Sequence, residues 1–94
     1  MSSQLSMKDL TVKFRSSHPD SHRSKTTIWQ TPEGSLYRVV QRSNDFEISI
    51  LASTGWIPLL HLHKDEDSVA DQDEAMSLWL RIQNPAQVEF RTKA

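Results

Sequence analysis

The chain has 94 residues and a formal net charge of −1, and 36% of its residues are hydrophobic. These values are typical of one small globular domain, and they exclude a fibrous protein and a chain that is disordered throughout. Cysteine is absent, which excludes a disulfide framework and a thiolate zinc site. The first residues do not resemble a signal peptide, and no uncharged run is long enough to span a membrane. We therefore expect a cytoplasmic protein that does not act at a membrane.

Charge is distributed unevenly along the chain. Residues 1–43 hold seven Lys and Arg against three Asp and Glu, whereas residues 44–94 hold four against nine. The first part is therefore basic and the second acidic. Either the fold mixes these charges on a common surface, or the molecule has a basic side and an acidic side.

The first predicted elements are a strand and a loop. Residues 10–14 alternate apolar and polar side chains, which predicts a strand with Val12 and Phe14 on one buried face. Residues 16–26 contain no large apolar side chain and are rich in Ser and His, so burial cannot offset the entropy cost of ordering them. We expect a mobile Ser/His-rich loop there.

A series of strands joined by tight turns is predicted next. Residues with β-branched and aromatic side chains favour strands at 27–31, 36–42, 46–52 and 56–63. Pro32 and Gly34 predict a turn after the first of these, because Pro presets φ and Gly permits a positive φ. Pro58 cannot donate a hydrogen bond to a neighbouring strand, which places the last of these strands at an edge or next to a bulge.

One helix is predicted from about residue 71 to residue 83. Asp71 is a candidate N-cap, with Glu74 three residues later as in a capping box, and Ser68 with Asp71 is an alternative cap one turn earlier. Pro85 ends the helix because a proline disfavours the helical conformation of the residue before it. Helical spacing predicts a buried stripe made of Ala75, Leu78, Trp79 and Ile82. Residues 86–92 alternate again and predict a short final strand.

These elements together predict the fold class. Strands joined by tight turns are antiparallel, and a single amphipathic helix can bury its stripe only against a sheet. We therefore predict one small α+β domain over residues 1–94. It consists of an antiparallel meander of about five to six strands. One helix packs on this sheet, and a final strand follows the helix in the chain.

Two sets of residues are candidates for a partner-binding surface. Carboxylates are concentrated in one segment, where they form either an acidic ridge that binds a partner or a solvated helix start; they are Asp65, Glu66, Asp67, Asp71, Asp73 and Glu74. Trp29 and Trp56 lie on less clearly apolar faces of their strands, and partly exposed tryptophans often anchor interfaces.

A third set indicates nucleic acid as the alternative partner. Nucleic-acid binding requires a basic surface, preferably with aromatic side chains that stack on bases. The first hairpin could supply both through Lys25, Trp29, Tyr37, Arg38 and Arg42.

His61 and His63 are the candidate metal ligands. Two histidines separated by one residue on a strand point to the same side, and His18 or His22 could complete a zinc site with them. The alternative, which we favour, is that both are polar positions near the end of a half-buried strand. We expect no metal and no cofactor.

The sequence contains no signature of catalysis. A glycine-rich phosphate loop and a Gly-x-Ser-x-Gly elbow are both absent, and the paired carboxylates lie where we expect them to be solvated. We therefore expect a protein that is not an enzyme and that binds another protein, such as a small regulator or inhibitor of the kind encoded by phages and mobile elements. The alternative is a nucleic-acid-binding accessory domain.

Overall fold

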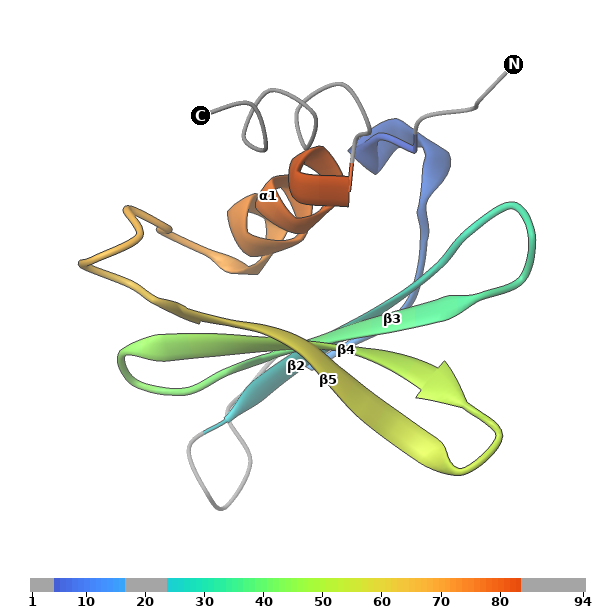
Figure 1. Cartoon of the computed structure of the whole chain (residues 1–94), viewed down its shortest axis with the longest axis horizontal. Helices are drawn as coiled ribbons and strands as arrows, with labels where there is room; N and C mark the ends of the chain where they lie inside the picture. Colours follow the sequence, from blue (N-terminus) through green and yellow to red (C-terminus); the bar gives the residue numbers. More distant parts are fainter. Residues whose placement is uncertain (1–4, 17–23, 84–94) are drawn as a thin grey trace, which may run out of the picture.

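The computed structural model describes residues 5–16 and 24–83, which form a five-stranded sheet and one α-helix (Figure 1). In chain order the elements are the 3-10 helix η1 (Met7–Asp9), the strands β1 (Thr11–Arg15), β2 (Lys25–Gln30), β3 (Leu36–Gln41), β4 (Asp45–Ala52) and β5 (Gly55–His63), and the helix α1 (Gln72–Gln83). Each strand pairs antiparallel with the next, so their order in the sheet is β1-β2-β3-β4-β5. The predicted α+β class and antiparallel meander are confirmed. The predicted final strand at 86–92 lies outside the described residues.

Glycines occupy two connections that require a positive φ. Gly34 has a φ of 98° in the turn between β2 and β3, and Gly55 has a φ of 125° where β5 begins. Side chains other than glycine are strained in this region of backbone space. In the first turn the Thr31 N–H donates to the Ser35 carbonyl at 2.9 Å, and the Gly34 N–H donates to the Thr31 carbonyl at 2.9 Å. The predicted turn from Pro32 to Ser35 is therefore confirmed.

α1 covers one face of the sheet. It packs on β3 and β4 and against η1, and Figure 1 shows α1 and η1 on the same side of the sheet. Side chains from this face of the sheet, from α1 and from the segment before α1 form the core: Trp29, Tyr37, Val39, Phe46, Ile48, Leu62, Val69, Ala75, Met76 and Leu80. No described helix lies on the other face, which we call the open face; it carries Phe14, Ile28, Arg38, Val40, Glu47, Ser49, Leu51, Trp56, Pro58 and His61.

The predicted helix stripe is confirmed at Ala75, whereas Leu78 and Trp79 pack against the core without being fully buried. Gln72, Ala75, Met76 and Leu80 are the buried residues of α1, whereas Leu78, Trp79 and Ile82 are only partly buried. The buried stripe therefore begins at a polar residue, which hydrophobic spacing alone does not reveal. Gln72 is tolerated there because its amide forms hydrogen bonds to the sheet.

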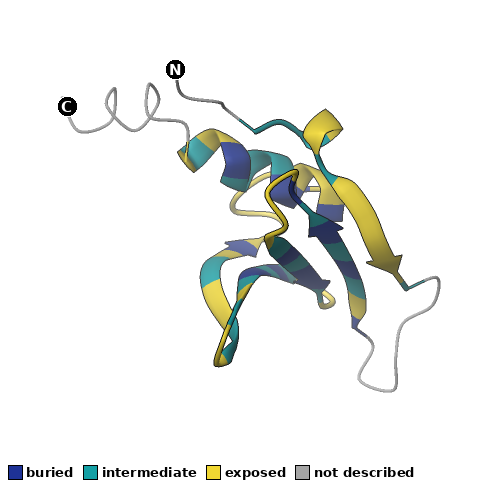
Figure 2. Cartoon of the chain, turned by 90° about the vertical axis from the view of Figure 1, so that its right-hand side faces the viewer, coloured by how far each residue is buried: buried dark blue, intermediate teal, exposed yellow. Residues whose placement is uncertain are grey.

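β1 also differs from the prediction, because all five of its residues are exposed (Figure 2). β1 lies at an edge of the sheet, and its pairing with β2 contains a bulge between Val12 and Phe14. Val12 pairs with Trp29 on the core side, whereas Phe14 pairs with Ile28 on the open face. The bulge adds one residue to the strand and thereby interrupts the alternation that would put both side chains on one face.

The prediction for Pro58 is confirmed, since β5 is the other edge strand and carries a bulge. The pairing of β4 with β5 shifts between Ile48 and Ser49, and Ser49 is the partner of Pro58. The loop predicted over 16–26 ends earlier than expected, because Ser24 is buried and β2 begins at Lys25. Residues 17–23 lie outside the described residues.

Candidate functional site

The predicted acidic ridge is exposed, but most of its carboxylates take part in local structure. The Asp71 carboxylate accepts a hydrogen bond from the Glu74 N–H at 2.9 Å, and the Glu74 carboxylate accepts one from the Ala70 N–H at 2.8 Å. Asp67 accepts a hydrogen bond from the His63 N–H at 2.7 Å. These contacts cap α1 and close the turn that follows β5. The predicted N-cap is confirmed, although the Glu74 side chain accepts a hydrogen bond from the Ala70 N–H and not from the Asp71 N–H of a capping box.

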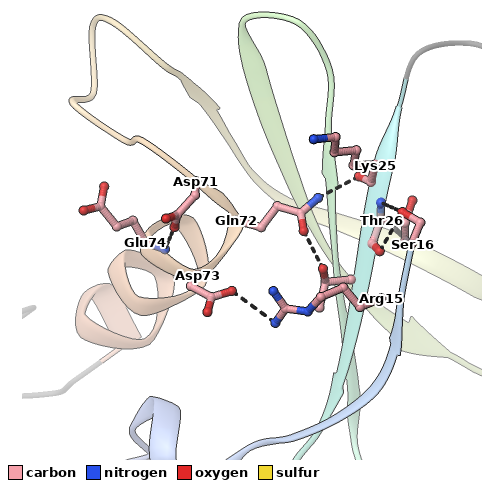
Figure 3. A network of polar contacts seen from close by, with 9 residues as sticks. Arg15, Ser16, Lys25, Thr26, Asp71, Gln72, Asp73 and Glu74 are labelled. Atoms are coloured by element: carbon pink, nitrogen blue, oxygen red, sulfur yellow. Dashed lines mark hydrogen bonds and ion pairs between the residues drawn. The ribbon is translucent and has the colours of Figure 1, made fainter. Parts of the chain in front are cut away.

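Arg15 and Gln72 join the start of α1 to the sheet (Figure 3). The Arg15 guanidinium lies 3.3 Å from the Asp73 carboxylate, and both side chains are about half exposed. The Gln72 amide accepts a hydrogen bond from the Thr27 hydroxyl and donates one to the Lys25 carbonyl at 2.8 Å. Only Asp65 and Glu66 of the predicted ridge have no hydrogen bond or ion pair with another described residue. The polar residues at the start of α1 therefore mainly cap the helix and hold it against the sheet.

The structure does not bring the predicted nucleic-acid-binding residues together. Trp29 is 2% exposed and Tyr37 is 7% exposed, and both belong to the core. This corrects their assignment to an accessible surface, and it also removes Trp29 from the predicted protein-binding aromatics. Lys25 pairs with Gln41, and Gln41 pairs with the core residue Phe46, so Lys25 lies on the core side of the sheet. Arg38 lies on the open face. The predicted set is therefore divided, with Lys25, Trp29 and Tyr37 on the core side, and only Arg38 and Arg42 on the open face.

A row of five residues crosses the open face, one from each strand. Consecutive register pairs join Phe14 to Ile28, Ile28 to Arg38, Arg38 to Ser49, and Ser49 to Pro58. We call these five residues the open-face row. Neighbouring strands lie about 4.8 Å apart, so the row spans about 19 Å. Only Arg38 in the row is charged, although sheet faces in contact with water are usually polar.

Leu51 and Trp56 extend this apolar surface beside the open-face row. They are register partners on β4 and β5, at the end of the hairpin. Phe14 and Leu51 are 51% and 42% exposed, which places both among the large apolar side chains that remain accessible to solvent. The sequence pattern assigned Phe14 to the core and did not single out Leu51. Knowledge of the bulge in β1 would have been needed to place Phe14 correctly.

Arg38 stacks on Trp56 at the centre of this surface. The guanidinium carbon lies 4.4 Å from the centre of the Trp56 ring, a cation–π contact. Ser49 lies on the strand between them and is 1% exposed. Burial lowers the pKa of Arg38, while the charge of Glu47 opposes this change and that of Arg42 adds to it.

Acidic side chains lie next to Arg42 and His61 on the open face. The Arg42 guanidinium lies 4.0 Å from the Glu47 carboxylate, and Nε2 of His61 lies 3.1 Å from the Asp45 carboxylate. The rings of His61 and His63 are 5.0 Å apart in an edge-to-face arrangement. Within residues 5–16 and 24–83, no three His, Cys, Asp or Glu side chains are grouped so that they could hold a metal ion. His18 and His22 lie outside the described residues.

Neither α1 nor η1, the helices of the described chain, has the length and apolar character needed to cross a membrane. Comparisons with protein families, with curated proteins and with solved structures found no match to this chain.

Proposed function

We propose that this protein is a binding module for another protein and that the open face contacts the partner. The observation that carries the proposal is the open face, which holds accessible apolar side chains on β1, β2, β4 and β5, at Phe14, Ile28, Leu51, Trp56 and Pro58, around the single charge of the open-face row. Contiguous apolar patches on a protein surface mark interaction sites. Trp and Arg, the types found at Trp56 and Arg38, are the residues that most often dominate binding energy at interfaces.

The charges of the open face favour a protein over a nucleic acid. Arg38 and Arg42 are accompanied there by Asp45 and Glu47, so the formal charges cancel. A phosphate backbone binds surfaces with a clear excess of Lys and Arg, because its affinity comes largely from counterion release. Trp29 and Tyr37, the aromatic side chains predicted to stack on bases, also lie in the core and are not accessible. Nucleic-acid binding remains the alternative.

The test compares two matched pairs of variants. Phe14→Ser and Leu51→Ser remove apolar side chains from the open face. Val12→Ser and Ile57→Ser are the controls, because Val12 is 46% exposed, Ile57 is 43% exposed, and both lie on the side of the sheet that α1 covers. Each variant is immobilised and used to capture proteins from a lysate of the native host, and circular dichroism confirms that it is folded.

We expect a specific protein to bind the wild type and both controls, and to bind the two open-face variants at least about tenfold less, as for loss of interface anchors. Equal capture by all four variants would contradict the proposal. A mobility-shift assay with single- and double-stranded DNA and RNA at low salt addresses the alternative. A shift that Arg38→Ala with Arg42→Ala abolishes would replace the protein-binding proposal by the nucleic-acid one.

Asp65 and Glu66 have a separate part in the proposal, which is to steer the partner during association. Both are exposed and lack a partner in the described chain, so their charge is available to solvent. Replacing both by Lys is expected to slow association and to flatten its dependence on salt, while dissociation changes little. Surface plasmon resonance with the captured partner measures both rates. A role as a non-catalytic regulator or inhibitor stays a prediction that identification of the partner would test.

A further inference from the structure

Arg38 is a charged residue in the middle of a largely apolar surface, so an apolar partner alone would leave its charge unpaired. It is the middle residue of the open-face row, between Ile28 on β2 and Ser49 on β4. All other Lys and Arg residues in the described part of the chain are exposed, whereas Arg38 is partly buried. Its Nε–H is fully buried and has no acceptor among the described residues. A buried polar group without a hydrogen-bond partner costs free energy, so this position is unusual for a solvated cation.

The acids near Arg38 do not neutralise it directly. Glu47 influences Arg38 electrostatically, but Glu47 lies within 4.0 Å of Arg42, and Asp45 is in contact with His61. In the described chain no carboxylate lies within 4.0 Å of the Arg38 guanidinium. Desolvation of this guanidinium also lowers its pKa. An anion of a partner that forms hydrogen bonds with the terminal nitrogens of the guanidinium would therefore offset part of its desolvation.

We infer that Arg38, held against Trp56, binds a carboxylate of the partner protein, and that this carboxylate is surrounded on the partner by apolar side chains. The inference rests on the proposed protein-binding function. The Trp56 ring lies against the guanidinium, which limits the movement of this group before binding. A guanidinium in a fixed plane matches the two oxygens of a carboxylate through its terminal nitrogens. Apolar groups lie on both sides, with Phe14 and Ile28 towards β1 and Pro58 towards the opposite edge.

A second copy of the chain fits this surface less well than an acidic partner. If two open faces packed about a two-fold axis through the middle of the open-face row, Arg38 would lie against Arg38 of the other copy. Two partly desolvated cations in contact repel each other. A nucleic acid would supply anions, but its neighbouring phosphates would also approach Asp45 and Glu47. One carboxylate within an apolar surface pairs with Arg38 and brings no further negative charge towards Asp45 and Glu47.

The experiment measures the contribution of the carboxylate with two short peptides. Ac-Leu-Glu-Leu-NH2 carries the carboxylate, and Ac-Leu-Gln-Leu-NH2 is its neutral counterpart of nearly the same size and shape. Each is titrated into isotope-labelled protein, and NMR follows the Arg38 side-chain Nε–H and the Trp56 indole N–H. We expect both signals to shift with the Glu peptide and the dissociation constant to be about fivefold to tenfold lower than for the Gln peptide.

Two variants of the same strand region identify the residue responsible. Arg38→Gln is expected to abolish the preference for the Glu peptide, whereas Arg42→Gln, the matched control, is expected to retain it because Arg42 is already close to Glu47. Equal affinity for both peptides, or no shift with either, would overturn the inference. A preference that Arg42→Gln removes and Arg38→Gln does not would also overturn it, as would stronger shifts with a short oligothymidylate than with the Glu peptide. The capture experiment with Phe14→Ser and Val12→Ser judges the proposed function separately.

Discussion

The guanidinium of Arg38 lies 4.4 Å from the ring centre of Trp56, although β4 runs between the strands that carry these two residues. Both side chains lie on the open face, and Ser49 on β4 is almost fully buried there. The contact therefore joins the middle strand of the sheet to its edge strand through side chains alone.

A double-mutant cycle should detect this contact in the stability of the protein. We expect Arg38→Ala and Trp56→Ala to be coupled by about 0.5–1 kcal/mol, the usual value for a cation–π pair that is partly exposed. Urea unfolding of the wild type, both single variants and the double variant measures the coupling. Strict additivity of the two substitutions would show that the stacking contributes nothing to folding.

Met76→Ala should be much more destabilising than Leu78→Ala. Met76 is 0% exposed and part of the core, whereas Leu78 is only partly buried on the flank of α1. Removing a fully buried side chain leaves a cavity and costs about 2–5 kcal/mol, and a partly exposed leucine leaves a smaller one. Chemical denaturation of both variants ranks them. The reverse order would restore the helix register that hydrophobic spacing predicts.

Asp71→Ala should cost about 1 kcal/mol, because it removes the acceptor of the Glu74 N–H in the first turn of α1. Asp65→Ala is the control, since Asp65 carries the same charge, is exposed and has no partner in the described chain. Thermal unfolding at low and high salt separates the cap from a general charge effect. If Asp65→Ala destabilised the protein equally, the loss would come from net charge and not from capping.

Gln72→Leu should cost about 1–3 kcal/mol, because the buried Thr27 hydroxyl and the part-buried Lys25 carbonyl would both lose their partner. Adding Thr27→Val removes one of the two groups left without a partner, and the double variant should regain part of the lost stability. The free energies of unfolding of the single and double variants provide the comparison. No recovery in the double variant would argue against the Thr27–Gln72 hydrogen bond.

Chelation should leave the melting temperature unchanged. His61 is engaged with Asp45, and the described residues contain no cluster of three potential ligands. Differential scanning calorimetry with and without EDTA is sufficient. A decrease of several degrees that zinc reverses would contradict the expectation of a metal-free fold.

The local pattern of the sequence was sufficient to predict most of the secondary structure. Alternation within residues 46–52, the turn chemistry of Pro32 and Gly34, and the Asp71 cap depend on interactions between residues that are close in the chain. Such interactions are visible in the sequence because backbone geometry places the interacting groups within a few residues of each other. The class of the fold followed from the tight turns, which require antiparallel neighbours.

Tertiary structure alone decided which side chains are accessible. The bulge in β1 places Phe14 on the open face, and the hydrogen bond that Thr27 of β2 donates to Gln72 allows this polar residue to lie on the buried face of α1. Trp29 lies in the core, whereas Trp56 lies on the open face and contacts Arg38. These outcomes depend on the register between strands and on the position of the helix over the sheet. Both are set by contacts between residues far apart in the chain, which periodicity within one segment cannot encode.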